Sequence, residues 1–212
     1  MIKVLIADDH ALVREGLKQV IGQHSDIEVT GEAKNGQEAL EKVWKEEFDV
    51  VLLDISMPGR SGMDILKEIK SAKPKLYVLM LSMHPEKQYA VRALKAGASG
   101  YLTKESAPDE LIDAIRRVSM GLKYVTISLA EKLAAELGDD QNKPLHEQLS
   151  DREFQVMVKI AKGNTVKEIA ANLSLSVKTI STYRTRVLEK MNMKNNSDIT
   201  SYLMENDLTD PL

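Results

Sequence analysis

The chain has 212 residues, of which 43% are hydrophobic and 29% charged, with 29 Lys and Arg against 32 Asp and Glu. This length fits two domains of ordinary size, and the apolar fraction is enough for packed cores, so wholesale disorder is excluded. The absence of cysteine excludes a disulfide scaffold, thiol catalysis and a cysteine zinc site, and it fits the cytoplasm. The apolar runs are short and the first residues lack a signal-peptide layout, so we expect no membrane association.

Residues 1–120 alternate between apolar runs and segments with helical spacing of apolar residues. The expected strands are Ile2–Ala7, Ile27–Ala33, Val50–Leu53, Leu76–Leu81 and Gly100–Leu102. The expected helices are Leu12–Ile21, Gly36–Glu46, Ser61–Ile69, Pro85–Ala96 and Pro108–Val118. Strands that are apolar on both faces are typical of a parallel sheet covered by helices. Right-handed crossovers then give an α/β fold with a doubly wound five-stranded parallel sheet.

Polar side chains end four of these apolar runs. They are Asp8, Asp9, Asp54, Ser82 and Lys104. Because the carboxyl ends of parallel strands meet at one edge of a sheet, we expect these side chains to converge there. Clustered carboxylates repel one another unless a cation lies among them, and Mg²⁺ prefers such oxygen ligands. A carboxylate can also accept a phosphoryl group, whose charge a lysine would help to neutralise.

Each of these residues taken alone also has a purely structural explanation. Asp9 could be the N-cap of the next helix, and Asp54 could be a loop-capping aspartate. Lys104 could be an ordinary surface lysine. The joint placement of all five at one edge of the sheet favours a phosphoryl and Mg²⁺ site over these explanations.

The segment from Asp54 to Gly62, with Met57 and Pro58, resembles the phospho-acceptor loop of bacterial response-regulator receiver domains, and Ala96–Lys104 resembles their fifth-strand segment. The resemblance implies a flavodoxin-like receiver over residues 1–120. It further implies that Asp54 accepts the phosphoryl group, that Lys104 contacts it, and that Ser82 and Tyr101 form the switch. The implied Mg²⁺ ligands are Asp8 in the outer shell and, in the inner shell, Asp9, Asp54 and the carbonyl of Ser56.

Residues 121–148 have the composition of a linker. A cluster of Gly, Asp, Asn and Pro at 138–144 breaks any regular element. Within the linker, Ser128–Leu137 has the apolar spacing of a short amphipathic helix. The expected role of this helix is to connect the two domains.

Residues 149–212 are expected to form a small all-α domain of four helices. Ser150 and Glu153 form a capping-box pattern at the start of the first helix, and Thr165 begins a short second one. Val177–Met191 is the third helix and Asn196–Met204 the fourth. In the third helix the inward residues are expected to be Val177, Ile180, Val187, Leu188 and Met191. Two helices joined by a short turn are typical of a helix-turn-helix.

The third helix is basic on its other faces. Residues 151–195 carry nine basic and four acidic side chains, net +5, in a chain of formal net charge −3. Leu149–Glu153, Lys167–Ala170 and Lys178–Ile180 resemble the matching segments of LuxR-type DNA-binding domains. The expected DNA contacts are Lys178, Thr179, Ser181, Thr182, Arg184, Thr185, Arg186 and Lys190.

A receiver followed by a LuxR-type domain is typical of the NarL/FixJ subfamily of response regulators. The resemblance implies a phosphorylation-controlled transcriptional regulator that binds double-stranded DNA and is no enzyme beyond its own aspartyl phosphorylation and dephosphorylation. Its expected partners are a sensor histidine kinase, a second copy when phosphorylated, and RNA polymerase. Two alternatives stay open: a phosphatase of small molecules, and a constitutive DNA-binding protein whose receiver only dimerises.

Overall fold

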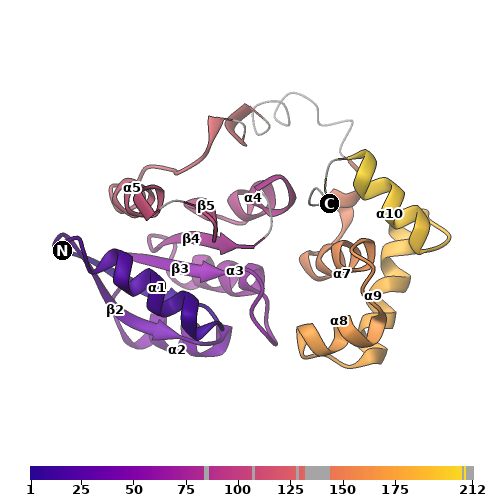
Figure 1. Cartoon of the computed structure of the whole chain (residues 1–212), viewed down its shortest axis with the longest axis horizontal. Helices are drawn as coiled ribbons and strands as arrows, with labels where there is room; N and C mark the ends of the chain where they lie inside the picture. The colour runs from indigo at the N-terminus through magenta and orange to yellow at the C-terminus, as the bar shows by residue number, and fades with distance from the viewer. Residues whose placement is uncertain (84–85, 107, 128, 132–143, 207, 209–212) are drawn as a thin grey trace. The chain divides into compact units, whose positions relative to one another are not determined.

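The computed structural model describes residues 1–83, 86–106, 108–127, 129–131, 144–206 and 208 (Figure 1). The chain divides into two compact units, residues 1–129 and 130–212, and each is described by itself. Most of the expected linker helix at 128–137 lies outside the described residues. Among the helices that are described, none combines the length and the apolar character needed to cross a membrane.

The first unit contains the expected five-stranded parallel sheet. Its strands are β1 (Ile2–Ala7), β2 (Ile27–Ala33), β3 (Val50–Asp54), β4 (Tyr77–Ser82) and β5 (Gly100–Thr103). They lie in the order β2-β1-β3-β4-β5, and every neighbouring pair is parallel. The central strand β3 is buried along its whole length, as its run of apolar residues predicts. The predicted doubly wound sheet is therefore confirmed.

Five helices cover the two faces of this sheet. They are α1 (Ala11–Ile21), α2 (Gly36–Lys45), α3 (Gly62–Ala72), α4 (Glu86–Lys95) and α5 (Pro108–Ser119). The apolar residues of α1 and α5 share one buried cluster with alternate residues of the strands. Right-handed crossovers through this strand order place α2, α3 and α4 on the opposite face. All the strands consequently end at the same edge.

The first unit continues beyond α5. After Gly121, which has a φ of +84°, the chain turns back and Tyr124 pairs in parallel with Gly100 of the edge strand β5. The backbone N–H of Tyr124 donates to the carbonyl of Ser99 at 2.9 Å. The first residues of the expected linker thus extend the edge of the sheet.

The second unit contains the four expected helices. They are α7 (Asp151–Ala161), α8 (Val166–Leu173), α9 (Val177–Lys190) and α10 (Asn196–Glu205), and a short 3₁₀ helix, η1 (Leu145–Gln148), precedes them. Capping boxes begin α7 at Ser150 and α8 at Thr165. Residues of α7, α8, α9 and α10 form the buried core, among them Phe154, Ile169 and Ile180.

The prediction that Val177 of α9 is buried is wrong. Ile180, Val187 and Met191 are buried as expected and Leu188 is partly buried, but 47% of Val177 is exposed. Val177 is the first residue of the helix, so no preceding helical turn covers it.

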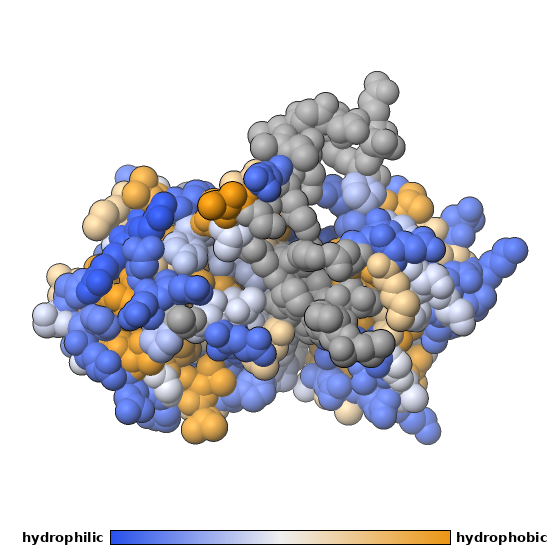
Figure 2. Space-filling view, turned by 45° about the horizontal axis from the view of Figure 1, so that its top comes forward, coloured by the Kyte–Doolittle hydropathy of each residue, from blue (hydrophilic) through white to orange (hydrophobic). Residues whose placement is uncertain are grey.

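Large apolar side chains also reach the surface elsewhere, such as Leu12 on α1 and Met204 on α10. Figure 2 shows that on one face of the molecule hydrophobic patches alternate with hydrophilic residues. Scattered exposure of this kind is ordinary for a folded protein.

Candidate functional site

The expected polar residues meet at the carboxyl edge of the sheet. The Nζ atom of Lys104, just after β5, lies 2.6 Å from Oδ2 of Asp8, just after β1. The same Nζ atom lies 3.0 Å from Oδ2 of Asp54, the last residue of β3. All three side chains are at most 6% exposed. The structure therefore brings together two carboxylates and one ammonium group in a pocket largely shielded from bulk water.

The loop after β3 holds Asp54 in place. Oδ1 of Asp54 accepts a hydrogen bond from the backbone N–H of Ser56 at 3.2 Å. A Cβ atom at Gly62 would lie only 2.0 Å from the carbonyl oxygen of Asp54, so no larger residue fits where α3 begins. Ser61 caps α3 with a capping box, which fixes this close approach.

The pocket places Asp54 in an unfavourable electrostatic environment for a carboxylate. Burial raises the pKa of the Asp54 carboxyl, and the negative charge of Asp8 raises it further. The ammonium group of Lys104 acts in the opposite direction and lowers it. Among these effects burial is the largest, so an additional positive charge in the pocket would stabilise the ionised form.

Several oxygens of the pocket are suited to a metal ion. Four buried side-chain oxygens have no hydrogen bond among the described residues: Asp8 Oδ2, Asp9 Oδ1, Asp54 Oδ2 and Ser56 Oγ. Lys104 and His10 lie at ion-pair distance from the three carboxylate oxygens. One ligand atom each from Asp8, Asp9, His10 and Asp54 lies within 4.8 Å of the others. A set of carboxylates with a spare hydroxyl oxygen fits Mg²⁺.

His10 is a pocket residue that the sequence reasoning missed. Its Nδ1 atom lies 3.2 Å from Oδ1 of Asp8 and 3.1 Å from Oδ1 of Asp9. It also occupies the N-cap position of α1, so the structural explanation of Asp9 as that N-cap does not hold. The signal was its place directly after the acidic pair.

The two expected switch residues are both buried. Ser82 at the end of β4 is fully buried, and Tyr101 in β5 is 2% exposed. Tyr101 also lines a small pocket of about 170 Å³ together with Tyr124. The ring of Tyr101, one of the two expected switch residues, therefore lies inside the receiver in this structure.

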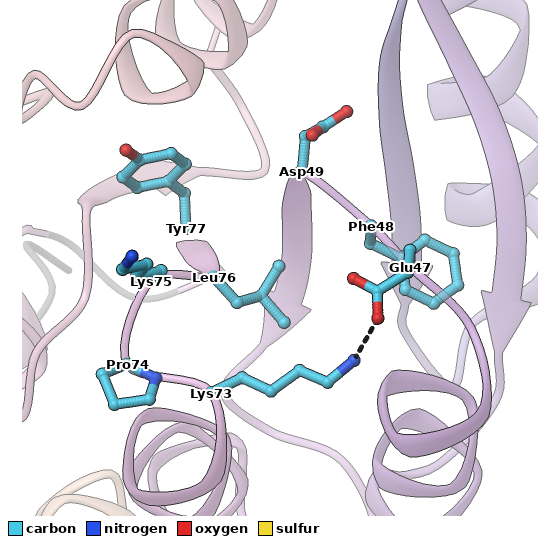
Figure 3. A pocket seen from close by; sticks show the side chains of 8 residues that line it. All are labelled: Glu47, Phe48, Asp49, Lys73, Pro74, Lys75, Leu76 and Tyr77. Carbon is cyan, nitrogen blue, oxygen red and sulfur yellow. Dashed lines mark hydrogen bonds and ion pairs between the residues drawn. The ribbon is translucent and has the colours of Figure 1, made fainter.

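A larger pocket lies at the opposite edge of the sheet. Figure 3 shows this pocket of about 450 Å³, which contains none of the expected site residues. Its charged residue Lys73 is already paired with Glu47 at 3.3 Å. It is lined by Glu47, Phe48, Asp49, Lys73, Pro74, Lys75, Leu76 and Tyr77.

The expected DNA contacts of the second unit lie on or beside one exposed face of α9. Lys178, Ser181, Thr182, Thr185, Arg186 and Lys190 are exposed, and Thr179 and Arg184 are partly buried. Two hydroxyls on this face donate to carbonyls one turn earlier, Thr182 to Lys178 and Thr185 to Ser181. Their protons are therefore engaged within the helix, and their methyl groups and lone pairs remain for a ligand.

Besides Thr182 and Thr185, three more of the eight expected contacts have hydrogen-bond partners within the second unit. Nε of Arg184 donates to Oδ1 of Asn196 at 2.7 Å, which ties α9 to α10. Nζ of Lys190 donates to Oε2 of Glu153 at 2.7 Å, which ties α9 to α7. Thr179 bonds to the helix-capping Ser176. These three side chains thus contribute to the fold of the unit, whatever they contact outside it.

Both units match known families. Residues 4–116 match the family described as response regulator receiver domain, and residues 147–203 match the bacterial regulatory proteins of the luxR family. The chain belongs to the response regulators, with a receiver domain and a LuxR-type DNA-binding domain. Its relatives place it with the NarL/FixJ type.

Similar proteins match over nearly the whole chain. The response regulator UvrY of Escherichia coli (strain K12) is 37% identical, over 94% of this chain and 92% of that protein. The oxygen regulatory protein NreC of Staphylococcus carnosus (strain TM300) is 36% identical, over 98% of this chain and 99% of that protein. A structure of RcsB from Salmonella enterica serovar Typhimurium, bound to promoter rprA in the presence of the phosphomimetic BeF3-, matches with a TM-score of 0.67 at 29% identity. The match covers 96% of this chain and 98% of that one.

Proposed function

We propose that Asp54 is the phospho-acceptor through which this response regulator is controlled. A sensor histidine kinase would donate the group: an oxygen of Asp54 forms a bond to phosphorus while the bond from phosphorus to the kinase histidine breaks. Lys104 already contacts the Asp54 carboxylate at 3.0 Å. It would hold a phosphoryl oxygen and neutralise part of its charge. The protein would catalyse nothing beyond this transfer and the later hydrolysis.

Mg²⁺ is the cofactor that the pocket fits. Asp9, Asp54 and the carbonyl of Ser56 would hold it directly, with Asp8 in the outer shell. When bound, Mg²⁺ would supply positive charge that favours transfer of the phosphoryl group. The carboxylates and the spare Ser56 hydroxyl in the pocket support this assignment.

The switch would work through Ser82 and the strand β5. A phosphoryl group adds about −1.5 to −2 charge and strong acceptor oxygens, and the Ser82 hydroxyl would gain a charge-assisted bond by turning toward it. Tyr101, already buried beside Tyr124, would then be held in its inward position. We propose that this stabilises a state that dimerises on double-stranded DNA and can engage RNA polymerase.

The exposed face of α9 would be the DNA-reading surface. Lys178 and Arg186 suit phosphates, and Ser181, Thr182 and Thr185 can reach base edges or phosphates. The match to the luxR family and the RcsB structure bound to promoter rprA support this proposal.

The ion-paired cluster of Asp8, Asp54 and Lys104 is the observation that carries the proposal. The test is to measure oligomeric size and binding to mixed duplex DNA with and without beryllofluoride and Mg²⁺. Wild type is compared with Asp54→Asn and with a matched control, Asp49→Asn, at the other end of β3. We expect wild type and Asp49→Asn to dimerise and bind DNA more tightly on treatment, and Asp54→Asn to stay unchanged.

Two other outcomes would contradict the proposal. Tight DNA binding by untreated wild type, with no change in size, would favour a constitutive protein whose receiver only dimerises. Incorporation of label from ³²P-acetyl phosphate into Asp54→Asn equal to that into wild type would show that the phosphoryl group goes elsewhere.

A further inference from the structure

Val177 is an exposed aliphatic side chain at the start of α9, where its helical spacing had predicted burial. It is 47% exposed, although Ile180 and Val187 of the same helix are fully buried. Isolated exposed apolar residues are common on protein surfaces. The position of Val177 on the helix therefore decides whether it has a function.

Val177 belongs to the same row of side chains as the expected DNA contacts. Ser181 and Thr185 follow it at intervals of four residues, which places all three on one side of the helix. Both are exposed, and Lys178 beside Val177 is exposed as well. The row therefore starts with a branched hydrocarbon and continues with hydroxyl residues, next to a cationic side chain.

The start of a recognition helix is where base edges are contacted. In helix-turn-helix proteins the first residues of the second helix enter the major groove and meet the bases. The only hydrocarbon group that a base pair presents in that groove is the C5-methyl of thymine, which aliphatic side chains contact. The side chain of valine has no hydrogen-bond donor or acceptor, so it cannot read any other feature of a base edge.

We propose that Val177 contacts the C5-methyl group of a thymine in the major groove and thereby sets a base preference at one position of each half-site. The proposal rests on the DNA binding proposed above. It adds a specificity-determining residue to a face otherwise made of hydroxyl and cationic side chains. Burying one methyl group against Val177 predicts a loss of roughly fourfold in affinity when that methyl is removed.

The test removes the methyl group from the DNA and the aliphatic group from the protein, separately and together. The full chain, treated with beryllofluoride and Mg²⁺, first selects a duplex from random sequence. Each thymine of that duplex is then replaced by deoxyuridine, which lacks only the methyl group, and affinity is measured by fluorescence anisotropy at fixed salt. The proteins are wild type, Val177→Ala, Val177→Thr and a control, Leu145→Ala, at another exposed apolar residue of the second unit.

We expect wild type and Leu145→Ala to bind more weakly when one particular thymine of each half-site is replaced by deoxyuridine. Val177→Ala should bind the thymine duplex more weakly than wild type does, and its affinity should not change when that thymine methyl is removed. Val177→Thr keeps one of the two side-chain methyl groups, so its loss of affinity on removal of the thymine methyl should lie between those of wild type and Val177→Ala. If Val177→Ala discriminates thymine from deoxyuridine as wild type does at every position, the proposal is overturned. Wild type that selects no sequence at all would overturn DNA recognition itself, which is a distinguishable result.

Discussion

Replacing Lys190 with alanine tests whether its ammonium group stabilises the second unit or binds DNA. Nζ of Lys190 lies 2.7 Å from Oε2 of Glu153, whose side chain is 3% exposed. The same oxygen accepts the backbone N–H of Ser150 at 2.8 Å. In Lys190→Ala, Glu153 would keep its capping bonds but lose its cation, and a buried carboxylate would remain without a charge partner.

The expected cost follows from these contacts. A hydrogen bond to a charged group contributes about 1.5–3 kcal/mol. Since the side chain of Lys190 is 42% exposed, solvent weakens the pair, and we expect a loss of about 1.5–2 kcal/mol from the lower part of that range. For a domain of this size this is a fall of roughly 6–16 °C in Tm.

The pH dependence has a definite sign. Burial raises the pKa of Glu153, but the bonds from Lys190 and Ser150 outweigh it, and the pKa lies below its usual value of 4.5. A lowered carboxyl pKa stabilises the folded state above the unfolded pKa, and this contribution is lost as the pH falls through the folded pKa. The stability difference between wild type and Lys190→Ala should therefore be full at neutral pH and shrink below about pH 4.5.

The measurement is denaturant unfolding of the full chain followed by circular dichroism. Trp44, the single tryptophan, lies in α2 of the first unit. The midpoint of the unfolding transition followed by its fluorescence should therefore be the same in wild type and variant, which makes it an internal control. Lys178→Ala, which removes an exposed lysine of the same helix, is the matched variant. Glu153→Gln combined with Lys190→Met removes both charges and should be less destabilised than Lys190→Ala alone.

One result would refute this reasoning. Lys190→Ala would unfold like wild type within about 0.5 kcal/mol, and at the same time its DNA affinity would fall and the salt dependence would weaken by about one phosphate contact. Lys190 would then contact a DNA phosphate in the complex instead of forming the ion pair with Glu153.

Three further predictions concern the first unit. Asp54→Asn should raise the free energy of unfolding at neutral pH without Mg²⁺. The reason is that the pKa of Asp54 is raised in the folded state, so wild type loses stability as the pH rises above the unfolded-state pKa of 3.8. In urea titrations, Mg²⁺ at ten times its Kd should stabilise wild type by about 1.4 kcal/mol and the variant by much less. Gly100→Val should release Tyr124 from β5, since a Cβ at Gly100 would lie 2.7 Å from the Tyr124 carbonyl oxygen; unchanged hydrogen exchange at the Tyr124 amide would contradict this. Arg116→Ala should raise the pKa of Asp26 from about 2 toward 3.8 in an NMR titration, because two bonds from Arg116 hold it down; the stability that this pair contributes is present above about pH 4 and lost toward pH 2.

The sheet and its carboxyl edge were predictable because they depend on patterns within short segments. Val50–Asp54 is apolar up to its last residue, and such a run has few stable positions other than the centre of a parallel sheet. Once the strands are parallel, the residues after them meet at one edge. The convergence of Asp8, Asp54 and Lys104 follows from that topology.

Contacts between distant segments gave no comparable signal. Glu153 and Lys190 are 37 residues apart, and nothing in either helix indicates that the lysine pairs with this glutamate. The pairing of Tyr124 with Gly100 likewise depends on the turn at Gly121. Val177 was misplaced because helical periodicity takes no account of where a helix starts, and a first residue has no preceding turn to pack against.

The pocket itself shows how function competes with stability in this fold. Asp8 and Asp54 lie buried around one lysine, and burial alone disfavours the ionised form of Asp54. A hydrophobic trio at these positions would favour the folded state more, because buried charges lose more solvation than a partner restores. The carboxylate cluster is therefore better explained by the ligands proposed above, a cation and a phosphoryl group, than by any need of the sheet.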